Sequence, residues 1–200
     1  MIKIKFCGLS RLCDIEAVNE MSPEYIGFVF TGKSSRYVPE QKASQLKSLL
    51  SRHIKAVGVF VDAEPRYIAD LIHAGIIDMV QLHGNEDNAY IDNLRLLTDK
   101  PIIKAFEVKT CTDIETVNHS SADYVLLDSG KGSGVLFDWK LIDKVNRSYF
   151  LAGGLNVCNV QDAVKNLHPF AVDVSSGIET DGVKDKAKMM EFIKAVRSGK

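Results

Sequence analysis

The amino-acid sequence predicts a protein of the α/β class, on three observations. Eight short apolar runs each end abruptly in polar residues or glycines. The runs start roughly 20 to 30 residues apart, which is the length of one strand and one returning helix. They are continuously apolar instead of alternating, as is typical of parallel strands buried on both faces. Eight such units in one short chain predict a closed (β/α)8 TIM barrel.

The eight runs are the predicted strands of this barrel. Val57–Val61 is a typical example, because it is apolar throughout and then gives way to the polar Asp62. Strands of this length and composition suit the wall of a small barrel. The predicted strands are Ile4–Cys7, Tyr25–Phe30, Ala56–Val61, Met79–Leu82, Ile102–Phe106, Tyr124–Leu127, Tyr149–Ala152 and Ala171–Val174.

Amphipathic stretches between the strands predict the returning helices. The segment Pro39–Ser51 opens with a proline, which suits a first helical turn, and places Ala43, Leu46, Leu49 and Leu50 on one face. An alternation of strand and helix predicts a parallel sheet. The further predicted helices are Pro65–His73, Tyr90–Leu97, Ile114–Asn118, Leu141–Val145, Val160–Leu167 and Lys186–Val196.

An open, doubly wound sheet is the alternative architecture. It usually has fewer strands and carries a G-x-G-x-x-G fingerprint after the first of them. Here the first strand is followed by Cys7-Gly8-Leu9-Ser10, which does not match that fingerprint. The closed barrel is therefore the preferred prediction.

Length and composition limit the possible functions. The chain has 200 residues, short for a barrel of this type, and residues 1–200 leave no room for a second domain. A net charge of −1 gives no electrostatic reason to expect nucleic acid or a membrane surface as partner. No apolar run approaches the roughly 18 residues of a membrane span, and the N-terminus has no signal-peptide pattern. We expect a cytoplasmic protein that acts on a small molecule.

The four cysteines do not form a C-x-x-C pair, so a structural zinc site is not expected. Cys13, Cys111 and Cys158 are expected to be small buried apolar residues. Cys7 differs because it ends the first predicted strand, where the loops of a barrel carry the chemistry. A thiol there acts as a base or nucleophile if its pKa is low enough, and is otherwise a core cysteine.

Asp128 is the second candidate for proton transfer. It ends the sixth predicted strand and follows apolar residues, an environment in which a carboxyl group can hold its proton near neutral pH and act as an acid. The glycine-rich segment Ser129–Gly134 comes next. Such a loop either folds over a ligand or is a plain surface turn.

Other polar side chains also stand at strand ends. Arg36 offers a planar, charged fork that suits a carboxylate or a phosphate. Asp62 is expected to cap the helix that begins near Pro65. His83 either contacts a ligand or bonds to a neighbouring loop. Lys104 lies inside an apolar strand, where an ion pair with a carboxylate is favoured over a Schiff-base role.

Small residues follow the last two predicted strands. Gly153 and Gly154 come after the seventh, and Asp173-Val174-Ser175-Ser176-Gly177 ends the eighth. Barrels frequently bind phosphate at these two loops, where exposed backbone N–H groups let the anion approach. The residues by themselves therefore predict a phosphorylated substrate, an arginine for a second anion and a Cys/Asp pair for proton transfer.

With these residues in view, the chain resembles the phosphoribosylanthranilate isomerase family of tryptophan biosynthesis along nearly its whole length. The resemblance depends on motifs that occur in family order, and their combination is far more specific than any one of them. The motifs are Lys5–Gly8, Gly27–Phe30, Ser35–Tyr37, Val57–Val61, Val80–Gly84, Leu126–Asp128, Phe137–Trp139, Gly153–Asn156 and Val172–Gly177.

The resemblance implies an Amadori rearrangement of N-(5-phosphoribosyl)anthranilate, with no metal or organic cofactor. It implies that Cys7 is the general base and Asp128 the general acid, and that Arg36 holds the anthranilate carboxylate. It implies a monomer or a homodimer. Substrate contacts are expected from Arg36, His83, Gly153, Gly154, Asp173, Ser175, Ser176 and Gly177.

The sequence also departs from the family pattern. Phe6 stands where isoleucine is usual, and the loop that contains Lys131–Gly134 lacks the usual adjacent glycines. Gly182–Asp185 differs slightly from the family version in a segment expected to cap the last helix.

Three alternatives to this isomerase remain open from sequence. One is another sugar-phosphate enzyme, either a metal-dependent epimerase that uses His83, Asp62 and Asp128 or an aldolase that uses Lys104. The second is a non-catalytic phosphate-binding barrel. The third is an isomerase that also serves histidine biosynthesis, although such enzymes tend to use paired aspartates and not the cysteine found here.

Overall fold

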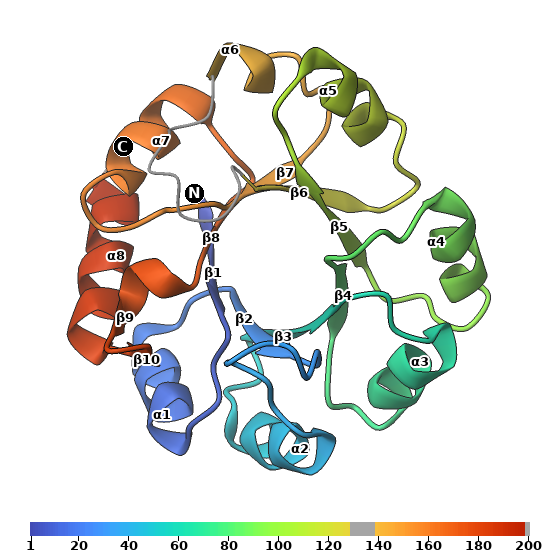
Figure 1. Ribbon diagram of the computed structural model, residues 1–200. Coiled ribbons are helices and arrows are strands. Elements are labelled where there is room, and N and C mark those ends of the chain that lie inside the picture. The colour runs from blue at the N-terminus through green and yellow to red at the C-terminus, as the bar shows by residue number, and fades with distance from the viewer. Residues whose placement is uncertain (129–138, 199–200) are drawn as a thin grey trace.

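The computed structural model describes residues 1–128 and 139–198. Within these ranges the chain forms a closed barrel in which strands β1 to β8 follow one another in sequence order, and every neighbouring pair is parallel. The helices lie outside the strands and surround them (Figure 1). The predicted (β/α)8 TIM barrel is confirmed.

The strands lie where the apolar runs predicted them, and no predicted boundary differs from the observed one by more than a residue. The agreement follows from the parallel barrel wall, which is buried on both faces and therefore needs continuous apolar runs. The strands are β1 Lys3–Cys7, β2 Tyr25–Val29, β3 Lys55–Phe60, β4 Met79–Leu82, β5 Ile102–Glu107, β6 Tyr124–Asp128, β7 Tyr149–Leu151 and β8 Ala171–Val174.

The helices include one that the sequence patterns did not predict. This helix, α1 (Leu12–Met21), returns the chain from β1 to β2 and buries Ile15, Ala17 and Val18. It has no proline at its start and leaves Leu12 half exposed, so its apolar stripe is short. The other helices are α2 Glu40–Leu49, α3 Pro65–His73, α4 Asn88–Arg95, α5 Cys111–Asn118, α6 Trp139–Ile142, α7 Val160–Leu167 and α8 Lys186–Ser198.

Between β8 and α8 the chain adds a short segment outside the barrel wall. It consists of the 3-10 turn η1 (Ser176–Ile178) and a two-stranded antiparallel hairpin of β9 (Glu179–Thr180) and β10 (Val183–Lys184). Asp185 then caps α8, since its carboxylate accepts the backbone N–H groups of Ala187 and Lys188 at 2.9 and 3.2 Å. The capping role expected for this segment is confirmed.

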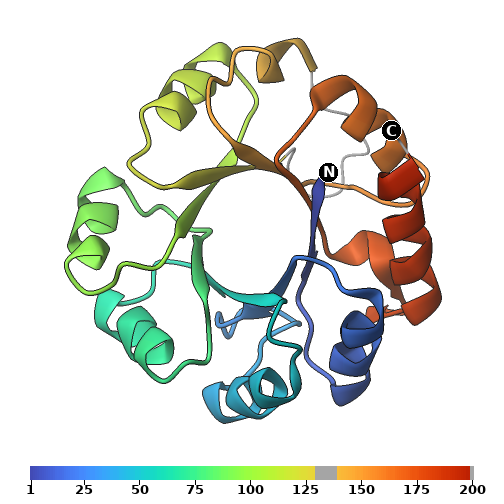
Figure 2. The same cartoon turned by 180° about the vertical axis from the view of Figure 1, so that it is seen from behind.

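Apolar side chains fill the space on both sides of the barrel wall. The interior cluster is centred on Phe150, which contacts Tyr25, Tyr124 and Phe170 edge-on or tilted. A larger cluster lies between the strands and the ring of helices, which encloses the barrel as seen from behind in Figure 2. None of the helices in the described ranges is long and apolar enough to cross a membrane.

Charged side chains are also buried in the barrel wall. Lys5 on β1 is 0% exposed, and its ammonium lies 2.8 Å from the Asp173 carboxylate on β8. The two residues are register partners across the strand pair that closes the barrel. Lys104 on β5 is 4% exposed and pairs with Glu86 at 3.0 Å. The ion-paired role favoured for Lys104 is therefore confirmed.

Two local predictions are wrong. Asp62 does not cap α3, because the N-cap residue is Glu64, and the Asp62 carboxylate accepts the Asn85 backbone N–H at 2.7 Å instead. Asp62 thus joins the loops after β3 and β4. The expectation of burial also fails for three cysteines, which lie on exposed parts of α1, α5 and the loop before α7. They are Cys13, Cys111 and Cys158.

Candidate active site

The C-terminal ends of the barrel strands bring the predicted proton-transfer residues to one mouth. In a parallel barrel all of these ends open on the same face, so residues distant in sequence meet there. Cys7 ends β1 and Asp128 ends β6. Cys7 belongs to a small buried cluster with Val29 and Val59, which are near the ends of β2 and β3.

The Cys7 thiol lies close to the buried ion pair of Lys5 and Asp173. Burial raises the pKa of Cys7, while the positive charges of Lys5 and Lys184 act to lower it and Asp173 acts to raise it. Burial opposes the charge on Lys5, yet Asp173 and Cys7 together raise the pKa of its ammonium. The thiol is therefore mainly protonated in the free protein, beside an ammonium that favours its thiolate form.

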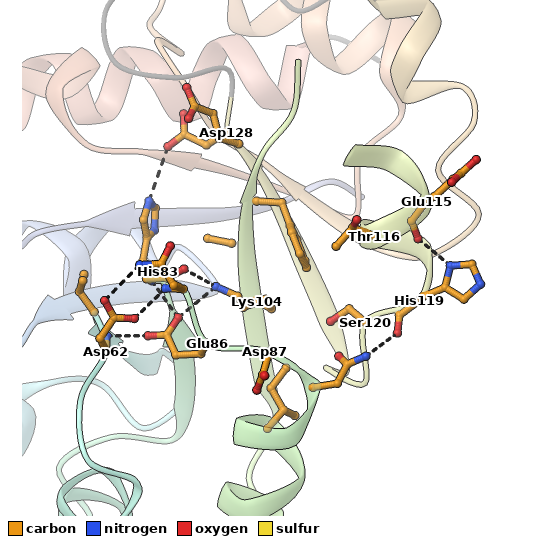
Figure 3. A pocket seen from close by; sticks show the side chains of 18 residues that line it. Asp62, His83, Glu86, Asp87, Lys104, Glu115, Thr116, His119, Ser120 and Asp128 are labelled. Atoms are coloured by element: carbon orange, nitrogen blue, oxygen red, sulfur yellow. Dashed lines mark hydrogen bonds and ion pairs between the residues drawn. The ribbon is translucent and has the colours of Figure 1, made fainter. Parts of the chain in front are cut away.

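Asp128 faces His83 across the mouth. The His83 Nε2 and Asp128 Oδ2 atoms are 3.7 Å apart, and the two side chains are 40% and 29% exposed. Figure 3 shows them pointing toward one another. Desolvation lowers the pKa of His83, although the Asp128 charge acts in the opposite direction. A neutral imidazole beside a carboxyl group can exchange a hydrogen bond with it in either protonation state.

Gln81 is bonded to the other nitrogen of the His83 ring. Its amide Nε2 is 2.9 Å from His83 Nδ1. Gln81 is 1% exposed, and its Oε1 atom has no hydrogen-bond partner among the described residues. The histidine is thus oriented from within the barrel wall, which could not be predicted because Gln81 lies inside a strand.

Arg36 lies on the opposite side of the mouth, in the loop between β2 and α2. Its guanidinium makes two bonds to the Glu179 carboxylate on β9, from Nε to Oε1 and from Nη2 to Oε2, both 2.7 Å long. The bonding to Glu179 raises the pKa of Arg36. Arg36 remains 30% exposed along its side chain, so an anion in the mouth can still reach it.

The two predicted phosphate loops meet outside β7 and β8. Gly153 and Gly154 adopt positive φ angles of 86° and 64°. Gly177 lies directly against the other loop, since a Cβ atom at that position would come within 1.9 Å of the Leu155 carbonyl oxygen. Only glycine fits at this position, because the backbones of the two loops are in direct contact there.

Two of the predicted substrate contacts have protein partners in this structure. The Ser175 hydroxyl donates to the Cys7 carbonyl at 3.1 Å and accepts from the Lys184 ammonium at 3.2 Å. The Asp173 carboxylate accepts from Lys5 at 2.8 Å. Ser176 and Gly177 form η1, next to these residues. The side chains of Asp173 and Ser175 are thus arranged around Cys7.

A cavity of about 1260 Å³ opens beside His83 and Asp128 and extends toward α4 and α5. Lys104 and Glu86 form part of its wall (Figure 3). Glu86 also accepts the backbone N–H groups of Asp62 and Gly84, each at 2.8 Å. These bonds fix the loops after β3 and β4 against β5. Cys7 and Arg36 do not line this cavity, so it covers only the Asp128 side of the mouth.

Several residues of the site were not singled out from the sequence. Lys5 carried the same signal as Lys104, a charge inside an apolar strand, and was noted only as part of a motif. Glu179 and Lys184 flank an Asp-Gly pair, which is a recognisable hairpin signal. Gln81 had no such signal. The predicted glycine loop Ser129–Gly134 and the Phe137–Trp139 motif lie wholly or largely outside the described residues.

Comparison with known proteins agrees with this geometry. A family profile described as N-(5'phosphoribosyl)anthranilate (PRA) isomerase matches residues 4–195. A curated N-(5'-phosphoribosyl)anthranilate isomerase of Endomicrobium trichonymphae is 44% identical, covering 99% of this chain and 100% of the relative. One from Thermoanaerobacter pseudethanolicus is 42% identical, covering 98% of each.

Solved structures give the same result. The crystal structure of phosphoribosyl anthranilate isomerase from Thermotoga maritima superposes with a TM-score of 0.90 at 36% identity, covering 99% of this chain and 100% of that one. A second, described as a complex with reduced 1-(o-carboxyphenylamino)-1-deoxyribulose 5-phosphate, has a TM-score of 0.87 at 35% identity, covering 99% and 100%.

Proposed function

Because this chain belongs to the N-(5'-phosphoribosyl)anthranilate isomerase family, we propose that it uses Cys7 as its general base and Asp128 as its general acid. The enzyme converts N-(5-phosphoribosyl)anthranilate to 1-(2-carboxyphenylamino)-1-deoxyribulose 5-phosphate, the third step of tryptophan biosynthesis from chorismate. This reaction is an Amadori rearrangement, in which an aldose derivative is converted within one molecule into a ketose derivative.

The rearrangement needs an acid and a base at different places on the sugar. Asp128, when protonated, gives its proton to the furanose ring oxygen as the C1–O bond breaks and an iminium forms. The Cys7 thiolate then removes the proton from C2, and the electrons of that C–H bond form the enolamine. The enolamine tautomerises to the ketone. An acid at the end of β6 and a base at the end of β1 place the two groups on well-separated parts of one mouth.

The remaining predicted residues hold the substrate. The free edge of Arg36 binds the anthranilate carboxylate, and His83 contacts the part of the substrate that lies next to Asp128. The backbones around Gly153, Gly154, Ser176 and Gly177 bind the phosphate, which suits two adjacent loops with uncrowded N–H groups. Asp173 and Ser175 support this site from beneath through Lys5, Lys184 and Cys7. The sequence implies no metal or organic cofactor in these steps.

The observation that carries the assignment of roles is the setting of Cys7. Its thiol ends a barrel strand beside the buried ammonium of Lys5, and family membership covers the strand that carries both. We further propose a cytoplasmic enzyme that acts as a monomer or a homodimer and folds as one domain over residues 1–200. Size-exclusion chromatography with light scattering would identify the oligomeric state.

The test is turnover of phosphoribosylanthranilate, followed by the loss of its fluorescence. We expect Cys7→Ala to lower kcat by about 10²-fold or more, the usual scale for loss of a general base. Binding of the reduced product analogue should change little, because the thiol acts on a proton and does not hold the ligand. Cys13→Ala, at an exposed cysteine, is the matched control. Near-normal turnover by the Cys7 variant would refute the proposed role.

A further inference from the structure

The hairpin of β9 and β10 has a fixed register. The two strands pair Thr180 with Val183 and Glu179 with Lys184. Asp181 and Gly182 connect them with positive φ angles of 51° and 78°, the signature of a two-residue type I′ turn. The turn therefore determines that Glu179 and Lys184 lie opposite one another, at the end of the hairpin nearest the barrel mouth.

Glu179 holds one edge of the Arg36 guanidinium. Its side chain is 6% exposed, and its two oxygens engage Nε and Nη2 of Arg36. A bidentate pair of this kind fixes the plane of the guanidinium as well as its position. The bonds leave Nη1 and the outer edge of the guanidinium uncommitted among the residues that the structure describes.

Lys184 keeps Glu179 in place. Its side chain is 2% exposed, and its ammonium donates to Glu179 Oε1 at 2.6 Å and to the Ser175 carbonyl at 3.0 Å. Burial acts to raise the pKa of Glu179, but the bonds from Arg36 and Lys184 outweigh it and lower that pKa. The carboxylate therefore stays charged and accepts from both side chains, although burial lowers the pKa of Lys184.

We propose that Glu179 is a positioning residue that fixes the guanidinium of Arg36 with its outer edge toward the barrel mouth, and that Lys184 secures Glu179 in this role. The ligand held at that edge is the aromatic carboxylate of the substrate. This inference rests on the proposed function of Arg36. It explains why a buried carboxylate lies beside an arginine that is meant to bind an anion. Glu179 occupies one edge of the Arg36 guanidinium and leaves the other edge available to the substrate carboxylate.

Two ligands separate positioning from general damage. One is reduced 1-(o-carboxyphenylamino)-1-deoxyribulose 5-phosphate, and the other is its counterpart made from aniline, which lacks the carboxylate. Their dissociation constants are measured by calorimetry on the full chain. For Glu179→Gln we expect binding of the carboxylated ligand to weaken about fivefold or more, the scale of part of one charged hydrogen bond. Binding of the aniline ligand should stay within about twofold.

The double variant Glu179→Gln/Lys184→Met separates orientation from charge. It removes one negative and one positive charge, so the net charge around Arg36 is unchanged while the bidentate contact is lost. We expect the same selective weakening as in the single variant. A conservative Lys184→Arg change, which keeps a cation on Glu179, should retain most of the affinity. For Glu179→Gln, steady-state kinetics provide a second readout, with KM rising and kcat changing much less.

Three results would overturn the proposal. Tighter binding of the carboxylated ligand by Glu179→Gln would mean that Glu179 competes with the substrate. An equal loss of affinity for both ligands would mean that the substitution damages the whole binding site and not the orientation of Arg36. Unchanged affinity in the double variant would mean that only charge matters. If the unmodified protein itself fails to prefer the carboxylated ligand, the failure lies in the proposed role of Arg36 and not in Glu179.

Discussion

At the scale of single residues, the environment of Cys7 determines how the proposed base behaves. Four charged side chains act on the thiol or on its thiolate, and they come from β1, β8, β10 and the loop after β2. They are Lys5, Asp173, Lys184 and Arg36. Burial nevertheless dominates and raises the pKa of the thiol. The Cys7 thiol is therefore mostly protonated at neutral pH in the free protein.

This protonation state predicts how the reactivity of Cys7 depends on pH. Only the thiolate is nucleophilic, so alkylation of Cys7 by iodoacetamide should be slow at neutral pH and should become faster from about pH 6 to about pH 9. Mass spectrometry of the peptide that contains Cys7 measures the rate, and the exposed Cys13 of the same protein is the control. A rate at Cys7 that stops rising below neutral pH would contradict the raised pKa.

The same reasoning predicts the effect of the ion pair next to the thiol. The effect of Lys5 on the pKa of Cys7 exceeds the opposite effect of Asp173, so Lys5→Met/Asp173→Asn should raise the pH at which Cys7 becomes reactive toward iodoacetamide. The variant leaves no unpaired buried charge, which favours folding. The pH dependence of Cys7 alkylation is the measurement. A shift to lower pH would show that the ammonium does not support the thiolate.

Arg36 supports a separate prediction at this scale. Arg36→Met removes the charged fork but keeps an unbranched apolar side chain, so KM should rise by about tenfold or more, as expected for loss of a charged hydrogen-bonded contact. The matched control is Arg66→Met, at an exposed arginine of α3. Michaelis–Menten kinetics with phosphoribosylanthranilate give the answer, and an unchanged KM would rule out the carboxylate contact.

At the scale of elements, the loops after β7 and β8 form one unit because η1 lies directly on the preceding loop. The contact point is Gly177, where a side chain would collide with the Leu155 carbonyl oxygen. Neither loop contains regular structure long enough to hold its shape alone. Their mutual contact therefore fixes the backbone groups that we propose for phosphate binding.

Gly177→Ala tests this contact. The added methyl group should force the two loops apart, destabilise the protein by about 1–3 kcal/mol as overpacking usually does, and raise KM. Gly32→Ala is the matched control, because a Cβ atom there meets nothing within 4 Å. Chemical denaturation and steady-state kinetics measure both effects. If the two alanine variants behave alike, the loops do not depend on this approach.

At the scale of the whole molecule, the pair of Lys5 and Asp173 joins the first and the last strand of the barrel. The partners are 168 positions apart in sequence and are hydrogen-bonded at 2.8 Å. Buried pairs add little stability compared with apolar residues, but removing one partner leaves an uncompensated charge. The pair therefore couples closure of the barrel to the chemistry of the neighbouring thiol.

The expected cost of breaking this pair is large. Lys5→Met should lower the free energy of unfolding by about 3–5 kcal/mol, because Asp173 then remains buried and unpaired. The double variant Lys5→Met/Asp173→Asn should regain much of this loss. Urea denaturation of the single and double variants makes the comparison. If the double variant is no more stable than the single one, the cost does not come from the unpaired charge.

Local sequence patterns are sufficient to predict the barrel and the end of it at which the polar side chains gather. Each strand is a local apolar run, and a parallel wall buried on both faces accepts no other pattern, so Met79–Leu82 and Ala171–Val174 were predicted to the residue. The rule that strand ends carry the site then selected Cys7, Arg36 and Asp128, whose side chains lie at or beside the mouth.

The groups that surround these residues could not be predicted, because they meet only in the closed fold. Contacts such as Lys5 with Asp173, Arg36 with Glu179 and Asp62 with Asn85 join segments far apart in sequence, and no local pattern encodes a partner. The exposure of three cysteines and the presence of α1 were not predicted for a related reason. Whether a residue is buried depends on which elements pack over it in the fold. A residue's chemistry is local, but its pKa, its orientation and its partners depend on the closed fold.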